Sequence, residues 1–421
     1  MPLTSPRNAP PSRLGKLLST WFPALGERNF RLFWLGQLVS LAGTWMQNLG
    51  QSWLVLELTG SPAKLGLVSA LQFLPMMLFS LVAGPFVDRF PKRKLLIITQ
   101  TMLMLLALAL ATLTATGLIR YWNLLVLACL LGFVNLLDMP TRQAFVIELS
   151  GRDKLMNAVS LNSAAFNLAR VIGPAIAGLL IEGIGIAPCF FLNALSFVAV
   201  IAALLRIDAG KKAVGGRFTG IGGVLDSARE GLRYILARRE IALPLGLLAV
   251  ISTIVINYNI FIPTFARGPL GGGASGFGFL MTAIGLGSLV AALVLAAQSR
   301  KGPSMKQLYG GALVMCVAFV LLGLQRNWLL SAALLVVIGF STISFTASTN
   351  ALIQLSSDDA HRGRVMSVFS LVFGGVTPIG ALYAGWFTDQ AGPSLAISTS
   401  GAVGLLATIL VIPLVRRAKR K

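Results

Sequence analysis

The stretch Ala83-Gly-Pro-Phe-Val-Asp-Arg-Phe-Pro-Lys-Arg-Lys94 joins the end of one long apolar segment to the start of the next. Gly84 is the small residue type that lets two membrane helices approach closely. Asp88 is an acid at the edge of hydrocarbon, where ionisable side chains are costly. The basic residues that follow are typical of a turn on the cytoplasmic side of a membrane. The stretch therefore predicts two spanning helices joined by a short cytoplasmic loop.

The composition is that of a polytopic membrane protein. Of the 421 residues, 56% are hydrophobic and 12% are charged. A soluble domain has about 25% charged residues. The chain also has long apolar runs, each of about the 20 residues that a helix needs to cross a bilayer.

The formal charge of +21 also occurs in nucleic-acid-binding proteins, so its distribution decides its meaning. Most cations lie in the N-terminal tail, the even-numbered loops and the C-terminal tail of the predicted spans. The odd-numbered loops hold only Lys64, Arg120, Arg267 and Arg326. This positive-inside pattern predicts that both termini are cytoplasmic. It favours contact with membrane lipid and gives no support to nucleic-acid binding.

The fold class predicted is all-α and polytopic, with twelve transmembrane helices in two pseudo-symmetric groups of six. The spans are expected at 31–56, 65–87, 95–117, 121–143, 157–181, 187–206, 242–266, 275–298, 308–325, 328–353, 365–388 and 394–415. The domains expected are a cytoplasmic tail (1–29), a six-helix bundle (30–206), a cytoplasmic linker with an amphipathic helix (207–240), a second six-helix bundle (241–415) and a basic tail (416–421).

The two halves have features of diverged copies. Ala177-Gly178 in the fifth span corresponds to Ala384-Gly385 in the eleventh, and Asn48 in the first corresponds to Asn259 in the seventh. Repeats of six helices place a binding site at their interface, near the middle of the membrane.

Three sequence motifs resemble those of the major facilitator superfamily. The loop of residues 83–94 resembles its motif A, with Pro91 in place of the second glycine. Gly173-Pro174-Ala-Ile-Ala-Gly178 resembles motif C, associated with exporters that work as antiporters, although a kink needed only for packing is an equal alternative. The runs 138–144 and 157–170 are similar to the bacterial branch with enterobactin exporters and macrolide-efflux proteins.

The resemblance implies a secondary active exporter in the bacterial inner membrane. Such a protein moves a bulky amphiphile, a siderophore or a drug, outward by alternating access, driven by proton antiport. The partners implied are a small-molecule substrate, the proton and membrane lipid, and a monomer is expected. The alternatives are a proton-linked or facilitative importer of a small solute, and a non-transporting membrane sensor.

The resemblance also implies a charged latch that holds the two halves together on the cytoplasmic side when the transporter faces outward. Asp138 and Arg142 are four residues apart and share a helix face if the helix continues through Pro140, and with Asp88 and Arg89 they would form one cluster. We expect Asp138, then Asp88, to respond to protons. The gating set is Gly84, Asp88, Arg89, Arg93, Asp138, Arg142, Gly173, Pro174 and Gly178.

In the family, helices one, four, seven and ten line the central cavity. Their polar and aromatic residues here are Trp45, Asn48, Gln51, Asn135, Asn257, Tyr258, Asn259, Ser344 and Ser348. Arg170 in the fifth span lies near mid-membrane, where an arginine must face water, an acid or carbonyls. It either attracts an anionic part of the substrate or pairs with helix-end carbonyls or an acid such as Asp138.

The sequence carries no signal of an enzyme. It has no Gly-x4-Gly-Lys-Ser/Thr phosphate loop. His361 is its single histidine, and Cys129, Cys189 and Cys316 lie in apolar spans without metal-ligand spacing. We therefore expect no catalytic site, no metal and no cofactor.

Overall fold

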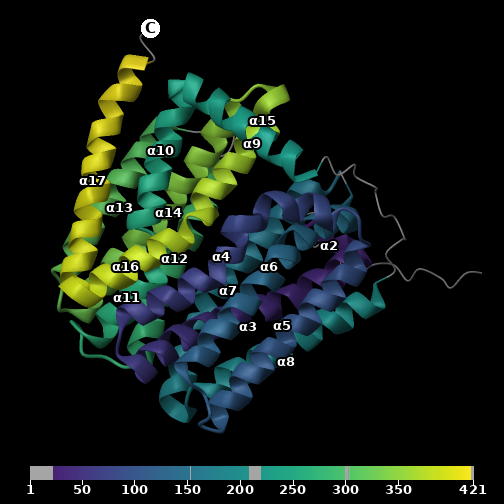
Figure 1. Ribbon diagram of the computed structural model, residues 1–421, viewed down its shortest axis with the longest axis vertical. Helices are drawn as coiled ribbons and strands as arrows, with labels where there is room; N and C mark the ends of the chain where they lie inside the picture. Colours follow the sequence, from purple (N-terminus) through teal and green to yellow (C-terminus); the bar gives the residue numbers. More distant parts are fainter. Residues whose placement is uncertain (1–21, 152, 208–219, 299–301, 303, 419–421) are drawn as a thin grey trace, which may run out of the picture.

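The computed structural model describes residues 22–151, 153–207, 220–298, 302 and 304–418, which fold into helices with no β-strand in these ranges. The long helices form two groups, drawn purple to blue and green to yellow in Figure 1. Between the groups in the sequence lies α9 (Gly220–Ala237). The predicted 1–29 tail lies mainly outside the described residues, as do part of the 207–240 linker and the end of the C-terminal tail.

The first group contains the long helices of the N-terminal half. After the short α2 (Pro23–Gly26) come α3 (Arg28–Thr59), α4 (Pro62–Val87), α5 (Lys92–Ala115), α6 (Tyr121–Ser150), α7 (Leu155–Ile184) and α8 (Ala187–Arg206). Gly60 ends α3 with a φ of +64°, a left-handed conformation that favours glycine. Helix α6 continues through Pro140, so Asp138 and Arg142 do share a helix.

The second group has two interrupted helices. It consists of α10 (Arg239–Ile254), α11 (Tyr258–Arg267), α12 (Ala274–Gln298), α13 (Met305–Gly323), α14 (Trp328–Leu355), α15 (Asp359–Ser370), a π-helical turn (Leu371–Gly375), α16 (Thr377–Ala391) and α17 (Pro393–Ala418). The seventh predicted span is thus broken at residues 255–257, and the eleventh changes to a π-helix before Pro378. A Cβ on Gly380 would lie 2.7 Å from the carbonyl oxygen of Thr253, so the glycine lets the broken helix pack against α16.

Among the residues that the structure describes, eleven helical segments are long and apolar enough to cross a membrane. The predicted span without such a segment is the first, which forms α3. Helix α3 has 32 residues, more than the about 20 that a crossing needs. Its polar side chains, among them Gln37, Gln47 and Gln51, are buried, and they lower its hydropathy. The twelve-helix prediction is therefore supported for eleven spans by composition, and for α3 by length and packing.

The two halves contact each other tightly at one end of the bundle. Helix α4 packs against α16, and α7 packs against α12 (Figure 1). A Cβ on Gly66 would lie 3.0 Å from the Cα of Gly385, and one on Gly278 would lie 2.9 Å from the Cα of Gly178. We call this end, which carries the chain reversals at 60–61, 185–186, 268–273 and 392, the closed end. The opposite end, with the loops at 88–91, 151–154 and 356–358, is the basic end.

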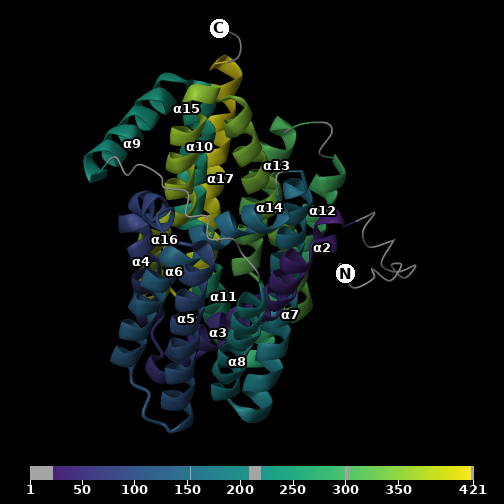
Figure 2. The same cartoon turned by 90° about the vertical axis from the view of Figure 1, so that its right-hand side faces the viewer.

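Helix α9 lies at the basic end against α15, as Figure 2 shows. The ring of His361 stacks on Tyr234 with centroids 4.3 Å apart. Arg238 pairs with Asp358 at 2.8 Å, and Arg364 pairs with Glu230 at 2.9 Å. These contacts attach the segment between the two halves to the second half.

We expect this attachment to weaken in acid. Hydrogen bonds with Tyr234 and Arg238 hold the pKa of the Asp358 carboxyl below its ordinary 3.8. A carboxyl whose pKa is lowered by folding stabilises the folded state above its ordinary pKa, and this is lost as the pH falls through the lowered value. The protection factors of the amides of residues 230–237, which correct for the intrinsic pH dependence of exchange, should therefore stay constant from about pH 7 to 5 and fall only below the ordinary pKa of an aspartate, about 4.

At neutral pH, Asp358→Asn should accelerate that exchange about twofold to fivefold, as expected for an exposed ion pair. Asp359→Asn is the matched control, because Asp359 pairs with Arg362 inside α15. Equal acceleration by the two variants would contradict the role assigned to Asp358.

Candidate substrate pathway and gate

Arg170 lies on α7 beside α3. Its guanidinium carbon is 5.6 Å from the centroid of the Trp45 ring, within the range of a cation–π contact. Trp45 also packs edge-on against Phe166, with centroids 5.7 Å apart. In the described part of the chain no carboxylate pairs with Arg170, and its buried Nε atom has no hydrogen-bond partner. The alternative in which Arg170 pairs with Asp138 is therefore not what the structure contains.

The broken seventh helix places polar groups of the second half near the same level. Tyr258 begins α11, and its hydroxyl lies 2.5 Å from the hydroxyl of Thr342 on α14. The turn of α7 that carries Arg170 faces this half, because the carbonyl oxygen of Arg170 would lie 2.9 Å from a Cβ on Gly285 of α12. Asn257 caps its own helix break by donating to the carbonyl of Thr253 at 2.8 Å. Asn259 is exposed, as a residue lining an open pathway would be.

A small polar cavity of about 30 Å³ joins the halves near Asn259. Asn48 and Gln51 from α3 and Gln72 from α4 line it, and Gln51 donates to Gln72 at 3.3 Å. A space of this size holds about one or two water molecules. The sequence analysis missed Gln72; the signal available was a glutamine within an otherwise apolar second span.

Three residues predicted for the pathway have other surroundings. Ser344 lines a separate groove between α12, α13 and α14, and its hydroxyl donates to the carbonyl of Phe340 at 2.9 Å. Ser348 is buried in α14, and Asn135 is half-buried in α6. Of these three residues, Ser344 lies in a groove other than the candidate pathway.

The two acids predicted for the latch, Asp88 and Asp138, pair with different basic residues. Asp138 is buried, pairs with Arg142 and accepts hydrogen bonds from Thr99 at 2.7 Å and Gln100 at 2.8 Å. Asp88 is half-exposed and pairs with Lys92 at 3.1 Å. In this state each acid therefore has a partner four residues along its own chain segment; the cluster that the resemblance implies belongs to the outward-facing state and stays a prediction.

The structure also differs from the sequence-based expectations for two further residues of motif A. A Cβ on Gly84 would meet no atom within 4 Å, so the close helix contact predicted there is absent in this state. Arg93 donates to the carbonyls of Leu204 and Leu205 at 2.6 and 2.8 Å. It therefore satisfies the otherwise unbonded end of α8, which is a structural role that the sequence analysis did not foresee.

The motif C residues are packing contacts on both sides of α7. A Cβ on Gly173 would lie 2.5 Å from the Cβ of Trp45 on α3. Gly178 faces Gly278 of the other half, as described above. Pro174 lies inside the helix, and its carbonyl oxygen would be 2.6 Å from a Cβ on Gly278. One turn of α7 therefore fixes both Trp45 and the contact between the halves.

Sequence comparison identifies curated relatives over most of the chain. It is 25% identical over 399 residues to the staphyloferrin A transporter of Staphylococcus aureus, covering 93% of this chain and 97% of that one. It is 28% identical over 371 residues to the multidrug efflux pump Tap of Mycobacterium tuberculosis, covering 84% and 86%. The enterobactin exporter EntS of Escherichia coli is 25% identical over 405 residues, covering 92% of both chains.

Solved structures share the fold at low sequence identity. A POT family transporter superposes with a TM-score of 0.74 at 11% identity, covering 93% of this chain and 96% of that chain. The nucleoside transporter NupG gives 0.70 at 12% identity, covering 92% and 98%. Residues 18–420 match the MFS_3 family model, described as "Transmembrane secretion effector". This chain therefore belongs to the transmembrane secretion effector family of major facilitator transporters, and it is a transporter rather than an enzyme.

Proposed function

We propose that this protein exports an amphiphilic small molecule across the bacterial inner membrane by alternating access. The support is its membership of a secretion family and its similarity to transporters named for siderophores and for multidrug efflux. The two halves contact each other at the closed end through paired glycines, an arrangement suited to rocking about the central site. We propose that the protein acts as a monomer, because one chain supplies both halves of the pathway.

The observation that carries the substrate class is the unpartnered Arg170. A buried guanidinium without an acid is costly unless a ligand supplies the negative charge. The N-terminus of α11 starts at Tyr258 in the other half, and a helix N-terminus also favours negative charge. We infer that the substrate carries a carboxylate or catecholate that binds between Arg170 and this helix end, while Trp45 and Phe166 contact its apolar part.

The orientation follows from the charges of the loops. The basic end carries the cations of motif A and of the loops near 151–154 and 356–358, so we assign it to the cytoplasm. Both termini are then cytoplasmic. The closed end faces the periplasm, and this conformation is the one that accepts substrate from inside the cell.

Proton coupling is assigned to Asp138, with Asp88 as the second candidate. Asp138 is buried among Thr99, Gln100 and Arg142, so a change of its protonation would alter contacts between α5 and α6. We expect Asp138→Asn to reduce transport driven by a pH gradient about tenfold or more, because general proton-transfer roles contribute at least that much. Counterflow of substrate without a gradient should persist. Full gradient-driven transport by Asp138→Asn would exclude this residue, and Asp88→Asn would then be measured.

Export itself is tested with the wild-type protein in proteoliposomes. The panel contains a catecholate siderophore, a carboxylate siderophore, a macrolide and a cationic dye, each with and without an imposed proton gradient. Gradient-dependent export of an anionic compound supports the proposal. Export of only neutral or cationic compounds would support the export function but contradict the proposed anion-binding site. Inward movement alone would favour the importer alternative.

A further inference from the structure

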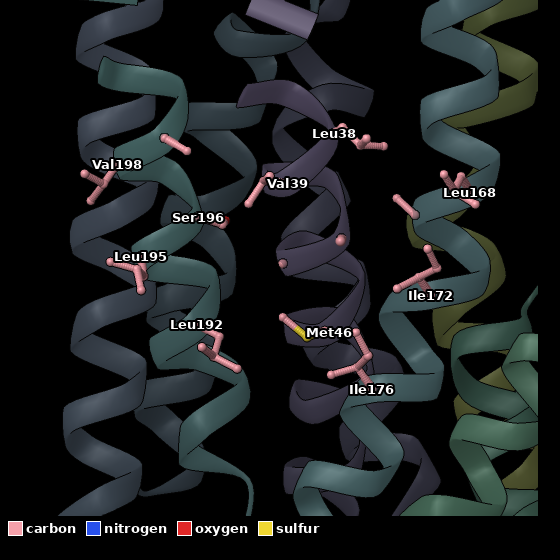
Figure 3. A pocket seen from close by; sticks show the side chains of 14 residues that line it. Leu38, Val39, Met46, Leu168, Ile172, Ile176, Leu192, Leu195, Ser196 and Val198 are labelled. Atoms are coloured by element: carbon pink, nitrogen blue, oxygen red, sulfur yellow. The ribbon is translucent and has the colours of Figure 1, made fainter. Parts of the chain in front are cut away.

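A groove on the N-terminal half is separate from the candidate pathway. Helix α3 packs against both α7 and α8, while α7 and α8 contact each other much less. The space between them has a volume of about 720 Å³. Figure 3 shows α3 in its centre, with Leu192, Leu195 and Val198 of α8 on one side and Leu168 and Ile172 of α7 on the other.

The groove is open to the bilayer and offers no group that needs a polar partner. Val39 is 52% exposed and Leu195 is 60% exposed. Its one hydroxyl, on Ser196, already donates to the carbonyl of Asn193 at 2.7 Å. An occupant of this surface must therefore be apolar and flexible, as a hydrocarbon chain is.

Cations lie beyond the groove on the same helix faces, toward the basic end. Arg31 precedes Leu38 by two turns on α3, and Arg206 follows Val198 by about two turns on α8. At 1.5 Å per residue both lie about 10–12 Å from the groove, less than the about 15 Å of one hydrocarbon leaflet. Both arginines are exposed, and among the described residues no acid forms an ion pair with either. The end of α8 is already capped by Arg93, so Arg206 is available to a ligand.

We propose that this groove is a binding site for one anionic phospholipid. One acyl chain lies along α3 between α7 and α8, and the phosphate lies between Arg31 and Arg206. The site is independent of the substrate site proposed above, because Arg170, Trp45 and Phe166 are not among the residues that line the groove.

The test is lipid retention by the purified full-length protein, measured by native mass spectrometry with phosphatidylglycerol or phosphatidylethanolamine of equal chain length. Attraction of one arginine to a lipid with a net negative charge contributes about fivefold, so two arginines should give about twenty-five-fold preference for phosphatidylglycerol in one bound copy. Arg31→Gln or Arg206→Gln should each reduce the preference to about fivefold. Lys94→Gln is the matched control, since Lys94 is exposed at the same end on α5.

A second variant tests the acyl chain separately from the phosphate. Ala42→Phe fills the floor of the groove and should reduce retention of both lipids without changing the ratio between them. If that variant does not fold, Val39→Trp tests the same point, because Val39 lies at an exposed position in the groove. Equal retention of the two lipids by the wild type would overturn the proposal. So would an effect of Lys94→Gln as large as that of Arg31→Gln, or unchanged retention when the groove is filled.

Discussion

Gly66→Ala and Gly278→Ala should each open the closed end and shift the protein towards its other conformation. A Cβ on Gly66 would lie 2.5 Å from the carbonyl oxygen of Ala381, and one on Gly278 would lie 2.6 Å from that of Pro174. These neighbours are backbone atoms of the opposite half, so the halves must separate to relieve the overlap. Overpacking of this kind costs about 1–3 kcal/mol, which changes the ratio of the two states about fivefold to 150-fold.

The measurement is the distance between spin labels on the two halves at the closed end. Leu118 and Leu324 are both 66% exposed and can be replaced by cysteine in a chain without its native cysteines. Gly246→Ala is the control, because a Cβ there meets no atom within 4 Å. We expect a longer-distance population in the two glycine variants and none in the control. Unchanged distances in both variants would show that the glycine contacts do not hold this end closed.

Arg170→Gln should weaken binding of an anionic substrate about tenfold to 100-fold and leave neutral and cationic compounds unaffected. A hydrogen bond to a charged group contributes about 1.5–3 kcal/mol, and this is lost with the guanidinium. Arg170→Lys should retain part of the affinity, because it keeps the charge without the planar group that lies over Trp45. Equilibrium binding to the detergent-purified protein, with one anionic, one neutral and one cationic compound, gives the comparison.

The thermal midpoint separates this binding role from a structural one. The buried Nε of Arg170 has no partner, so replacing the arginine breaks no hydrogen bond at that atom and removes a buried charge without an acid. We therefore expect an unchanged or higher Tm in Arg170→Gln. A lower Tm together with equal loss of all three compounds would mean that Arg170 supports the fold.

The helix positions could be predicted from sequence because lipid demands long apolar runs with satisfied backbones. The loop after Val87 and the start of α8 at Ala187 agree closely with the prediction. The breaks at 255–257 and at the π-helical turn could not be predicted, because each lies inside a segment whose length and hydropathy fit one continuous spanning helix. They depend on packing between distant segments, such as Gly380 against Thr253.

The candidate site was predictable where spacing within one helix decides the contact. The Asp138–Arg142 pair follows from a separation of four residues. The contacts of Arg170 and Gly178 join different halves and depend on which end of the bundle is closed. Sequence matched Gly178 with Gly385 as equivalent residues, but the structure places each against a different glycine, Gly278 and Gly66.

The polar composition of α3 has a consequence for how the protein is made. This helix emerges from the ribosome before α4 to α17, yet among the long helices of the described residues it is the one whose composition alone does not predict a membrane span. Gln47 accepts a hydrogen bond from Asn193 of α8 at 2.7 Å, and Gly43 packs directly against the same residue. A polar face of this kind inserts poorly without a partner. Synthesis of the sixth span would therefore complete the membrane integration of the first, so that the N-terminal half is assembled as a unit rather than helix by helix.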